Sequence, residues 1–123
     1  MKIKSTNKLL NSLTKKELAK LQSNYELNDA LIQKGLNPKA VEVVVKFFNP
    51  TGIGTWYLTE LSPENIGFGL CHLQEVELGY VCLKELASFR GRGGLPIEKD
   101  RYFSGKDLSL SSLSKKLNQE NKW

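Results

Sequence analysis

The side chains that could do acid, base or metal chemistry are few and scattered in this sequence. His72 is the only histidine, so a nucleophile–histidine arrangement or a general base working near neutral pH would have to include it. Cys71, His72 and Cys82 together suggest a zinc site, but adjacent strand residues point to opposite faces and no Cys-x-x-Cys spacing is present. The sequence therefore predicts no metal and no small-molecule cofactor.

Three glutamates are the remaining candidates for catalysis. Glu60, Glu77 and Glu98 would have to come together for general acid and base work. Use of these carboxylates as structural hydrogen-bond or salt-bridge acceptors is the favoured interpretation. An enzyme that acts through them is therefore only the third functional hypothesis, and the leading expectation is a protein that is not an enzyme.

Residues 90–94 read Arg-Gly-Arg-Gly-Gly, which resembles a short nucleic-acid-binding tract. A single copy at the end of a helical pattern favours instead a helix C-cap with two exposed arginines. Arginines and aromatic residues are also the usual anchors of protein interfaces. The predicted partner-binding residues are Trp56, Tyr57, Arg90, Arg92, Glu98 and Arg101. For Trp56 and Glu98 a structural role is an equally good interpretation.

The elements that must position these residues begin with a helix. Thr14 and Glu17 form a capping box, and Leu18 and Leu21 continue an apolar stripe at helical spacing. A second helical stretch is expected over 27–34, with its leucines and Ile32 facing inward, before a break at Asn37-Pro38. A further short helix is expected after Val81.

Strand patterns fill the middle of the chain. From Val41 to Phe48 the period becomes strand-like, with Val41, Val43, Val45 and Phe47 expected on one face. Further strands are expected over residues 55–61, 66–72 and 76–81, separated by turns rich in Asn, Pro and Gly. The prediction is an α+β fold, an antiparallel meander of about four strands with an amino-terminal helix and a short helix after strand four.

Glycines in the third and fourth strands indicate a close approach of some other group. A hairpin near Gln74 places Gly69 opposite Gly79. An aromatic residue such as Trp56 or Tyr57, or the amino-terminal helix, is the favoured neighbour. A ligand or a partner loop is the alternative.

The length of 123 residues, of which 40% are apolar, fits one modest core. The expected organisation is a flexible basic arm at 1–11, a single α+β domain at 12–107, and an amphipathic helix or flexible tail at 108–123. The chain has two cysteines, no apolar run long enough for a membrane helix, and a polar sequence after Met1-Lys2-Ile3-Lys4. These features predict a cytoplasmic protein without a membrane partner.

The formal net charge of +5 is distributed unevenly. Residues 1–40 carry +5, residues 41–107 carry −2 and residues 108–123 carry +2. Lysine-rich ends favour solubility, and they can also bind nucleic acid or an acidic protein surface. Direct nucleic-acid binding through these ends, with Arg90 and Arg92, is the second functional hypothesis.

Several ordered segments resemble the domain-of-unknown-function family 2958. They are Phe47-Phe48-Asn49-Pro50, Thr55-Trp56-Tyr57-Leu58-Thr59-Glu60, Phe68-Gly69-Leu70, Glu77-Leu78-Gly79-Tyr80-Val81, Glu85-Leu86, Arg90-Gly91 and Gly94-Leu95-Pro96-Ile97-Glu98-Lys99-Asp100. The resemblance extends from about Leu13 to Ser104. It implies an accessory protein of plasmids, phages or integrative elements, and a link to a type II anti-CRISPR protein with a related domain.

Two positions depart from the family pattern. Cys82 stands where the family often has serine, so the following helix has a poorer cap and a thiol that its amino terminus could activate. Lys99 replaces a common arginine, which argues against a required planar, bidentate contact there. The resemblance supplies no catalytic residues.

The leading functional hypothesis is a non-enzymatic interaction protein of a mobile genetic element. It would act in counter-defence, as an anti-CRISPR inhibitor that binds a Cas9-type nuclease. The physical argument is that a small basic domain without a reaction centre must act by occupying a surface.

Overall fold

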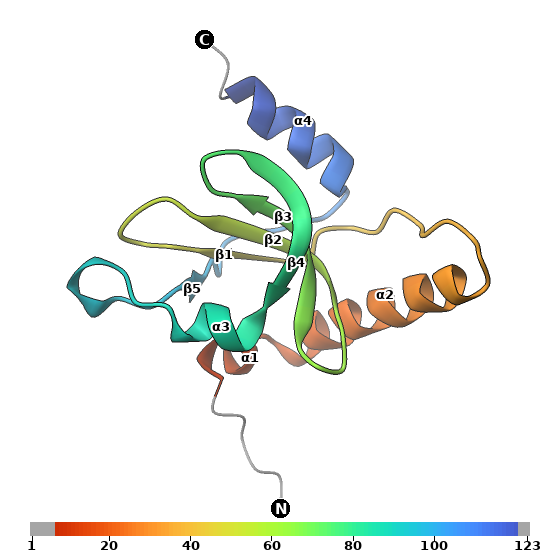
Figure 1. Cartoon of the computed structure of the whole chain (residues 1–123), viewed down its shortest axis with the longest axis horizontal. Helices are drawn as coiled ribbons and strands as arrows, with labels where there is room; N and C mark the ends of the chain where they lie inside the picture. The colour runs from red at the N-terminus through yellow and green to blue at the C-terminus, as the bar shows by residue number, and fades with distance from the viewer. Residues whose placement is uncertain (1–6, 121–123) are drawn as a thin grey trace, which may run out of the picture.

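The computed structural model describes residues 7–120 and contains a five-stranded antiparallel sheet with strand order β4-β3-β2-β1-β5 (Figure 1). The strands are β1 Val45–Phe48, β2 Thr55–Leu61, β3 Ile66–His72, β4 Val76–Cys82 and β5 Glu98–Lys99. Strands β1 to β4 follow one another as a meander, and β5 pairs with the free side of β1. The α+β fold is confirmed, and β5 is an addition to the four expected strands.

Four α-helices accompany the sheet: α1 Lys8–Ser12, α2 Lys15–Gln33, α3 Leu83–Ser88 and α4 Leu110–Glu120. The capping box of α2 is confirmed, because Glu17 N–H donates to Thr14 Oγ1 at 3.0 Å and Thr14 N–H donates to Glu17 Oε1 at 2.9 Å. No helix in the described part of the chain is long and apolar enough to cross a membrane.

Helix α2 is continuous rather than two pieces, and its inward face differs from the expectation. Leu27 and Ile32 are 42% and 57% exposed, whereas Leu21, Asn24 and Asn28 are buried at helical spacing. Asn24 Nδ2 donates to the Thr59 carbonyl at 3.0 Å. The prediction that the leucines and Ile32 of residues 27–34 face inward was therefore wrong. It relied on apolar character alone, but polar side chains can be buried when they are hydrogen-bonded, as Asn24 is.

Within residues 7–120 the core consists of two clusters. Helix α4, at the top of Figure 1, belongs to one cluster, and α1 and α3, at the bottom, belong to the other. The first cluster joins the sheet to α1, α2 and α3 through Leu9, Leu21, Val45, Phe47, Leu58, Leu61, Leu83, Leu86 and Ile97. The second joins the sheet to α4 through Val43, Tyr57, Leu70, Leu113 and Leu117. Helix α4 therefore covers one part of the sheet, and α1, α2 and α3 cover another.

The described part of the expected arm at 1–11 is helical instead of flexible. Leu9 is only 3% exposed, and the Asn7 side chain caps α1 by accepting the Leu10 N–H at 2.9 Å. Leu9 in the core cluster, Leu10 and Leu13 packed against that cluster, and the N-cap together hold this short helix in place. Residues 1–6 of the expected arm, and residues 121–123 of the expected tail, lie outside the described residues. Within 108–120 the helical alternative is the one observed.

The expected strand at 41–48 is shorter than its apolar pattern. Val43 N–H donates to the Leu108 carbonyl at 2.9 Å, and Glu42 forms an isolated bridge with Ser109. Val43 belongs to the α4 cluster, whereas Val45 belongs to the other cluster. Val43 therefore packs toward α4, whereas Val45 packs toward the other cluster. The two residues do not share one face, contrary to the prediction from their alternating pattern.

Gly69 and Gly79 face each other as expected. An added Cβ at Gly69 would overlap the backbone carbonyl oxygen of Tyr57, close to a register shift between Leu58 and Glu60. The close neighbour is thus a bulged strand and not an aromatic ring. A Cβ at Gly79 would meet no described atom within 4 Å.

Candidate interaction surface along β5

The three glutamates considered for catalysis do not come together. Glu77 lies on β4 and Glu98 on β5, the two opposite edges of the sheet. With a strand spacing of about 4.8 Å, four spacings separate them by roughly 19 Å. Glu60 accepts a hydrogen bond from Asn28 Nδ2 at 2.9 Å. These positions do not form one acid–base centre.

The residues considered for zinc are also apart. Cys71 pairs with Glu77 and Cys82 with Ile66, so the thiols lie toward opposite ends of the β3–β4 ladder. Within residues 7–120 no three His, Cys, Asp or Glu side chains are grouped to hold a metal ion. Burial, and secondarily the charge of Glu77, raises the pKa of the Cys71 thiol, which makes it a poor nucleophile at neutral pH. Cys82 is the N-cap of α3 and makes no side-chain capping bond.

Two predicted partner-binding residues are part of the core. Tyr57 is 7% exposed, belongs to the α4 cluster and contacts the Phe103 ring edge-to-face at 5.8 Å. Its predicted exposure is wrong, because α4 covers this face of β2. Trp56 is half-buried against the other cluster, and its ring contacts Gly54, where an added Cβ would lie 2.8 Å from the ring.

The arginines of the Arg-Gly segment have different environments. Arg90 Nη1 donates to the carbonyls of Ala87 and Phe89 at 2.9 and 2.7 Å, so its guanidinium satisfies the carboxyl end of α3. The C-cap of α3 is Phe89, so the segment 90–94 is not itself the C-cap that the sequence predicted, although the Arg90 side chain contributes to this helix end. Arg92 has an exposed side chain, and its backbone N–H donates to Thr51 Oγ1 at 3.0 Å.

The loop that carries Arg92 is a closed turn. Gly91 N–H donates to the Leu95 carbonyl at 2.7 Å, and Gly94 N–H donates to the Gly91 carbonyl at 3.0 Å. Gly93 and Gly94 have φ angles of 72° and 77°, a region that favours glycine. An added Cβ at Gly91 would overlap Thr51 Oγ1. The turn is thus held against the loop that joins β1 and β2.

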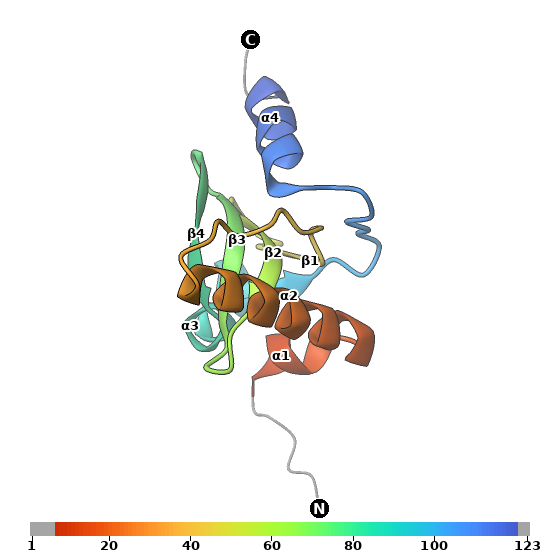
Figure 2. The ribbon, with the colours of Figure 1, turned by 90° about the vertical axis from the view of Figure 1, so that its right-hand side faces the viewer.

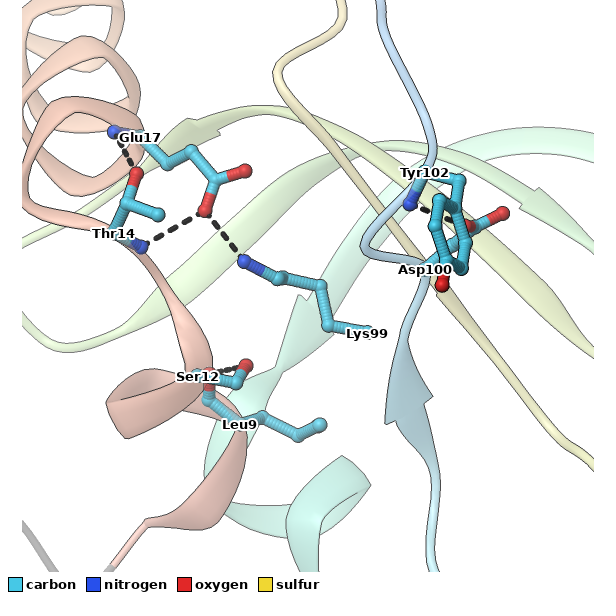
Figure 3. Close-up of polar contacts among 7 residues, drawn as sticks. All are labelled: Leu9, Ser12, Thr14, Glu17, Lys99, Asp100 and Tyr102. Atoms are coloured by element: carbon cyan, nitrogen blue, oxygen red, sulfur yellow. Dashed lines mark hydrogen bonds and ion pairs between the residues drawn. The ribbon is translucent and has the colours of Figure 1, made fainter.

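Strand β5 has only two residues, but an ion pair fixes it to the start of α2 (Figure 3). Lys99 Nζ lies 2.8 Å from Glu17 Oε1, the same oxygen that accepts the Thr14 N–H. The Lys99 side chain is 9% exposed. Burial opposes ionisation of Glu17, but the hydrogen bonds from Lys99 and Thr14 prevail and lower its pKa.

A turn after β5 directs two side chains outward. Asp100 Oδ1 accepts the Tyr102 N–H at 2.9 Å, as seen in Figure 3, and Asp100 Oδ2 lies 3.7 Å from Lys46 Nζ. The Asp100 N–H donates to the Lys46 carbonyl at 2.9 Å. With Asp100 fixed in this way, Arg101 is exposed and Tyr102 is 91% exposed.

A groove of about 420 Å³ lies beside this turn. Its lining combines apolar groups with charged ones: Lys8, Leu9, Ser12, Ala87, Pro96, Ile97, Glu98, Lys99 and Arg101. We call Glu98, Arg101 and Tyr102, together with this groove, the β5 surface. Sequence reasoning missed Tyr102, although an Asp two residues before it is the signal of a side-chain-capped turn.

Comparisons with known proteins give one positive result. No curated protein and no solved structure matches the chain. A family model described as "Protein of unknown function (DUF2958)" matches residues 12–122, which is nearly the whole chain and includes β5 and the turn after it. The resemblance inferred from the ordered segments is confirmed. The chain belongs to the DUF2958 family of proteins of unknown function.

Proposed function

We propose that this chain is a non-enzymatic interaction protein of a mobile genetic element and that its β5 surface binds a protein partner. We further propose that the partner is a Cas9-type nuclease, which the chain inhibits in counter-defence. The observation that carries the proposal is the pair Arg101 and Tyr102, exposed beside a groove on a turn fixed by Asp100.

The chemistry of these side chains supports protein binding. Tyrosine and arginine are enriched among the residues that dominate interface energies. A backbone already held by Asp100 and by the Lys99–Glu17 pair loses little conformational freedom on association. The β5 surface therefore has both suitable side chains and a preorganised frame.

Charge indicates which surface of a partner would fit. Lys8 and Arg101 are exposed cations at this surface, and Glu98 is the exposed carboxylate beside them. An acidic patch on the partner complements this balance, because nucleic-acid channels are themselves positive and would repel it. Binding of this kind weakens as salt concentration rises.

The direct test is a pull-down of purified guide-loaded Cas9-type nucleases, followed by a DNA-cleavage assay. We expect the wild-type chain to bind and to reduce cleavage, and we expect the double variant Arg101→Glu/Tyr102→Ala to lose both effects. Lys115→Glu/Asn118→Ala is the matched control, because it makes the same change of net charge at exposed α4 residues outside the β5 surface. Retained binding by the β5 variant would contradict the proposed surface. An absence of binding and inhibition across several nucleases would contradict the proposed partner.

The second candidate function is direct binding of DNA or RNA. The exposed Lys8 and Arg101 at one groove favour it, since phosphate contacts use such cations. Deletion of residues 1–11 is a poor test because it removes the buried Leu9. Deletion of 1–6 and 121–123, combined with Lys8→Glu, tests the basic ends without removing any described residue. If this function holds, affinity for naked nucleic acid falls steeply with salt and falls further in that variant.

A further inference from the structure

Strand β4 forms an edge of the sheet that no other strand covers within residues 7–120. Figure 2 shows it at the outer margin of the molecule. Two apolar side chains on this strand face solvent, because Leu78 is 61% and Tyr80 is 77% exposed. Tyr80 also contacts the Phe68 ring, with centroids 5.1 Å apart. The edge therefore combines backbone groups available for pairing with an apolar strip.

Helix α4 contacts β4 at its Val76 end, but the protective devices that a strand itself can carry are mostly absent from β4. The strand has seven residues, Val-Glu-Leu-Gly-Tyr-Val-Cys, with no proline and no lysine. Its pairing with β3 is continuous over all seven positions and contains no bulge. Glu77 is the single charge. Soluble proteins usually interrupt, charge or cover such an edge, so its features suit pairing with another strand.

The strand is complementary to a second copy of itself. Gly79 is the midpoint of Val76–Cys82, so antiparallel pairing about Gly79 uses every residue of both strands. In that register Leu78 lies opposite the second copy's Tyr80, and Glu77 lies opposite its Val81. The two strands then form two cross-strand Leu78–Tyr80 pairs. Each pair lies next to a Phe68–Tyr80 contact, so the apolar contacts extend from one copy into the other.

Electrostatic repulsion in this arrangement is small. The two Glu77 residues are offset by four positions along the strands, which corresponds to about 14 Å. This separation exceeds the screening length of about 8 Å at physiological ionic strength. No position within Val76–Cys82 places like charges directly opposite. This register thus has apolar matching without a charge conflict.

We propose that two copies of this chain associate through their β4 edges, paired antiparallel about Gly79 into one ten-stranded sheet. In this isologous interface each copy contributes β4. The β5 surface of each copy therefore remains free to bind a partner. One strand from each copy makes a small interface, and the dimer is accordingly concentration-dependent.

Light scattering coupled to size-exclusion chromatography over a concentration series tests the association. We expect the wild-type mass to rise from one chain to two, and the double variant Leu78→Lys/Tyr80→Lys to stay at one, because the introduced lysines oppose each other. Leu78→Lys/Tyr80→Glu places opposite charges across the same pairs and restores the dimer. Ile32→Lys/Ile53→Lys is the control, since it removes equally exposed apolar side chains elsewhere. A wild type that stays at one chain throughout would overturn the proposal.

Cysteine cross-linking tests the register. In the proposed pair Val76 lies opposite the second copy's Cys82, so Cys71→Ser/Val76→Cys treated with diamide should give a covalent dimer on a non-reducing gel. Adding Cys82→Ser should abolish that dimer. If the cross-link forms equally well without Cys82, the register is wrong. Circular dichroism of each variant verifies that the fold is retained, and the Arg101→Glu/Tyr102→Ala variant should dimerise normally whatever its effect on partner binding.

Discussion

At the residue scale, the facing glycines Gly69 and Gly79 have opposite surroundings. A side chain at Gly69 would overlap the Tyr57 carbonyl, whereas one at Gly79 would meet no described atom within 4 Å. We therefore expect Gly69→Ala to lower the free energy of unfolding by about 3 kcal/mol, since the neighbour is backbone and cannot rotate away. Gly79→Ala should change it by less than about 0.5 kcal/mol. Urea denaturation of both variants measures the difference, and equal values would contradict the observed packing.

Lys99 offers a second residue-scale prediction. Lys99→Met should lower the free energy of unfolding by roughly 1 kcal/mol at neutral pH, because the pair with Glu17 is lost and that carboxylate is partly exposed. Lys99→Arg, which keeps a cation, is the control.

The pH dependence of this variant follows from Glu17. Its pKa in the folded chain is lowered despite burial, by the bonds from Lys99 and Thr14. A lowered carboxyl pKa contributes stability above the unfolded value of about 4.3, and that stability is lost as the pH falls through the folded value. The difference between wild type and Lys99→Met should therefore shrink below about pH 4. A difference that stays constant across this range would show that Glu17 is not responsible.

At the element scale, the boundaries of β2 and β3 follow the sequence because turn residues delimit them. Ser62-Pro63-Glu64-Asn65 separates the two strands, and Asn65 has a φ of 61°, which asparagine tolerates well. Strand β5 was not predictable in the same way. A strand of two residues is too short to show the alternation of apolar and polar residues that predicts a strand. Glu98–Lys99 is extended because it pairs with the side of β1 that β2 leaves free.

Helix α4 provides the element-scale prediction. Leu113 and Leu117 are 4% and 7% exposed and pack with Tyr57 and Leu70. We expect Leu113→Ala to lower the free energy of unfolding by about 2 to 3 kcal/mol, as for other buried leucines. Ser111→Ala, at an exposed position of the same helix, should have little effect. Coincident unfolding curves for the two variants would mean that α4 is not part of the cooperative core.

At the scale of the whole molecule, the sequence predicted the fold class, the four meander strands and the family. It did not predict which exposed residues share a surface. Tyrosine is common in protein interfaces, but α4 covers Tyr57 in this fold. The contact between Tyr57 and α4 joins segments that are far apart in the chain, so the local sequence does not predict it. Leu78 and Tyr80 have the apolar character of core strand residues, yet both are exposed on the edge strand β4. Exposure depends on tertiary packing, which local periodicity does not encode.

The ion pair between Glu17 and Lys99 joins positions 82 residues apart in the chain. Because Glu17 also closes the capping box of α2, fraying of that helix end removes a support of β5 at the same time. Amide hydrogen exchange should consequently report the first turn of α2 and β5 as one opening unit, although they are distant in sequence. A protease that cuts near Thr14 would then release the turn that carries Arg101 and Tyr102, so local unfolding near the start of the chain would change a part of the β5 surface that lies far along the sequence.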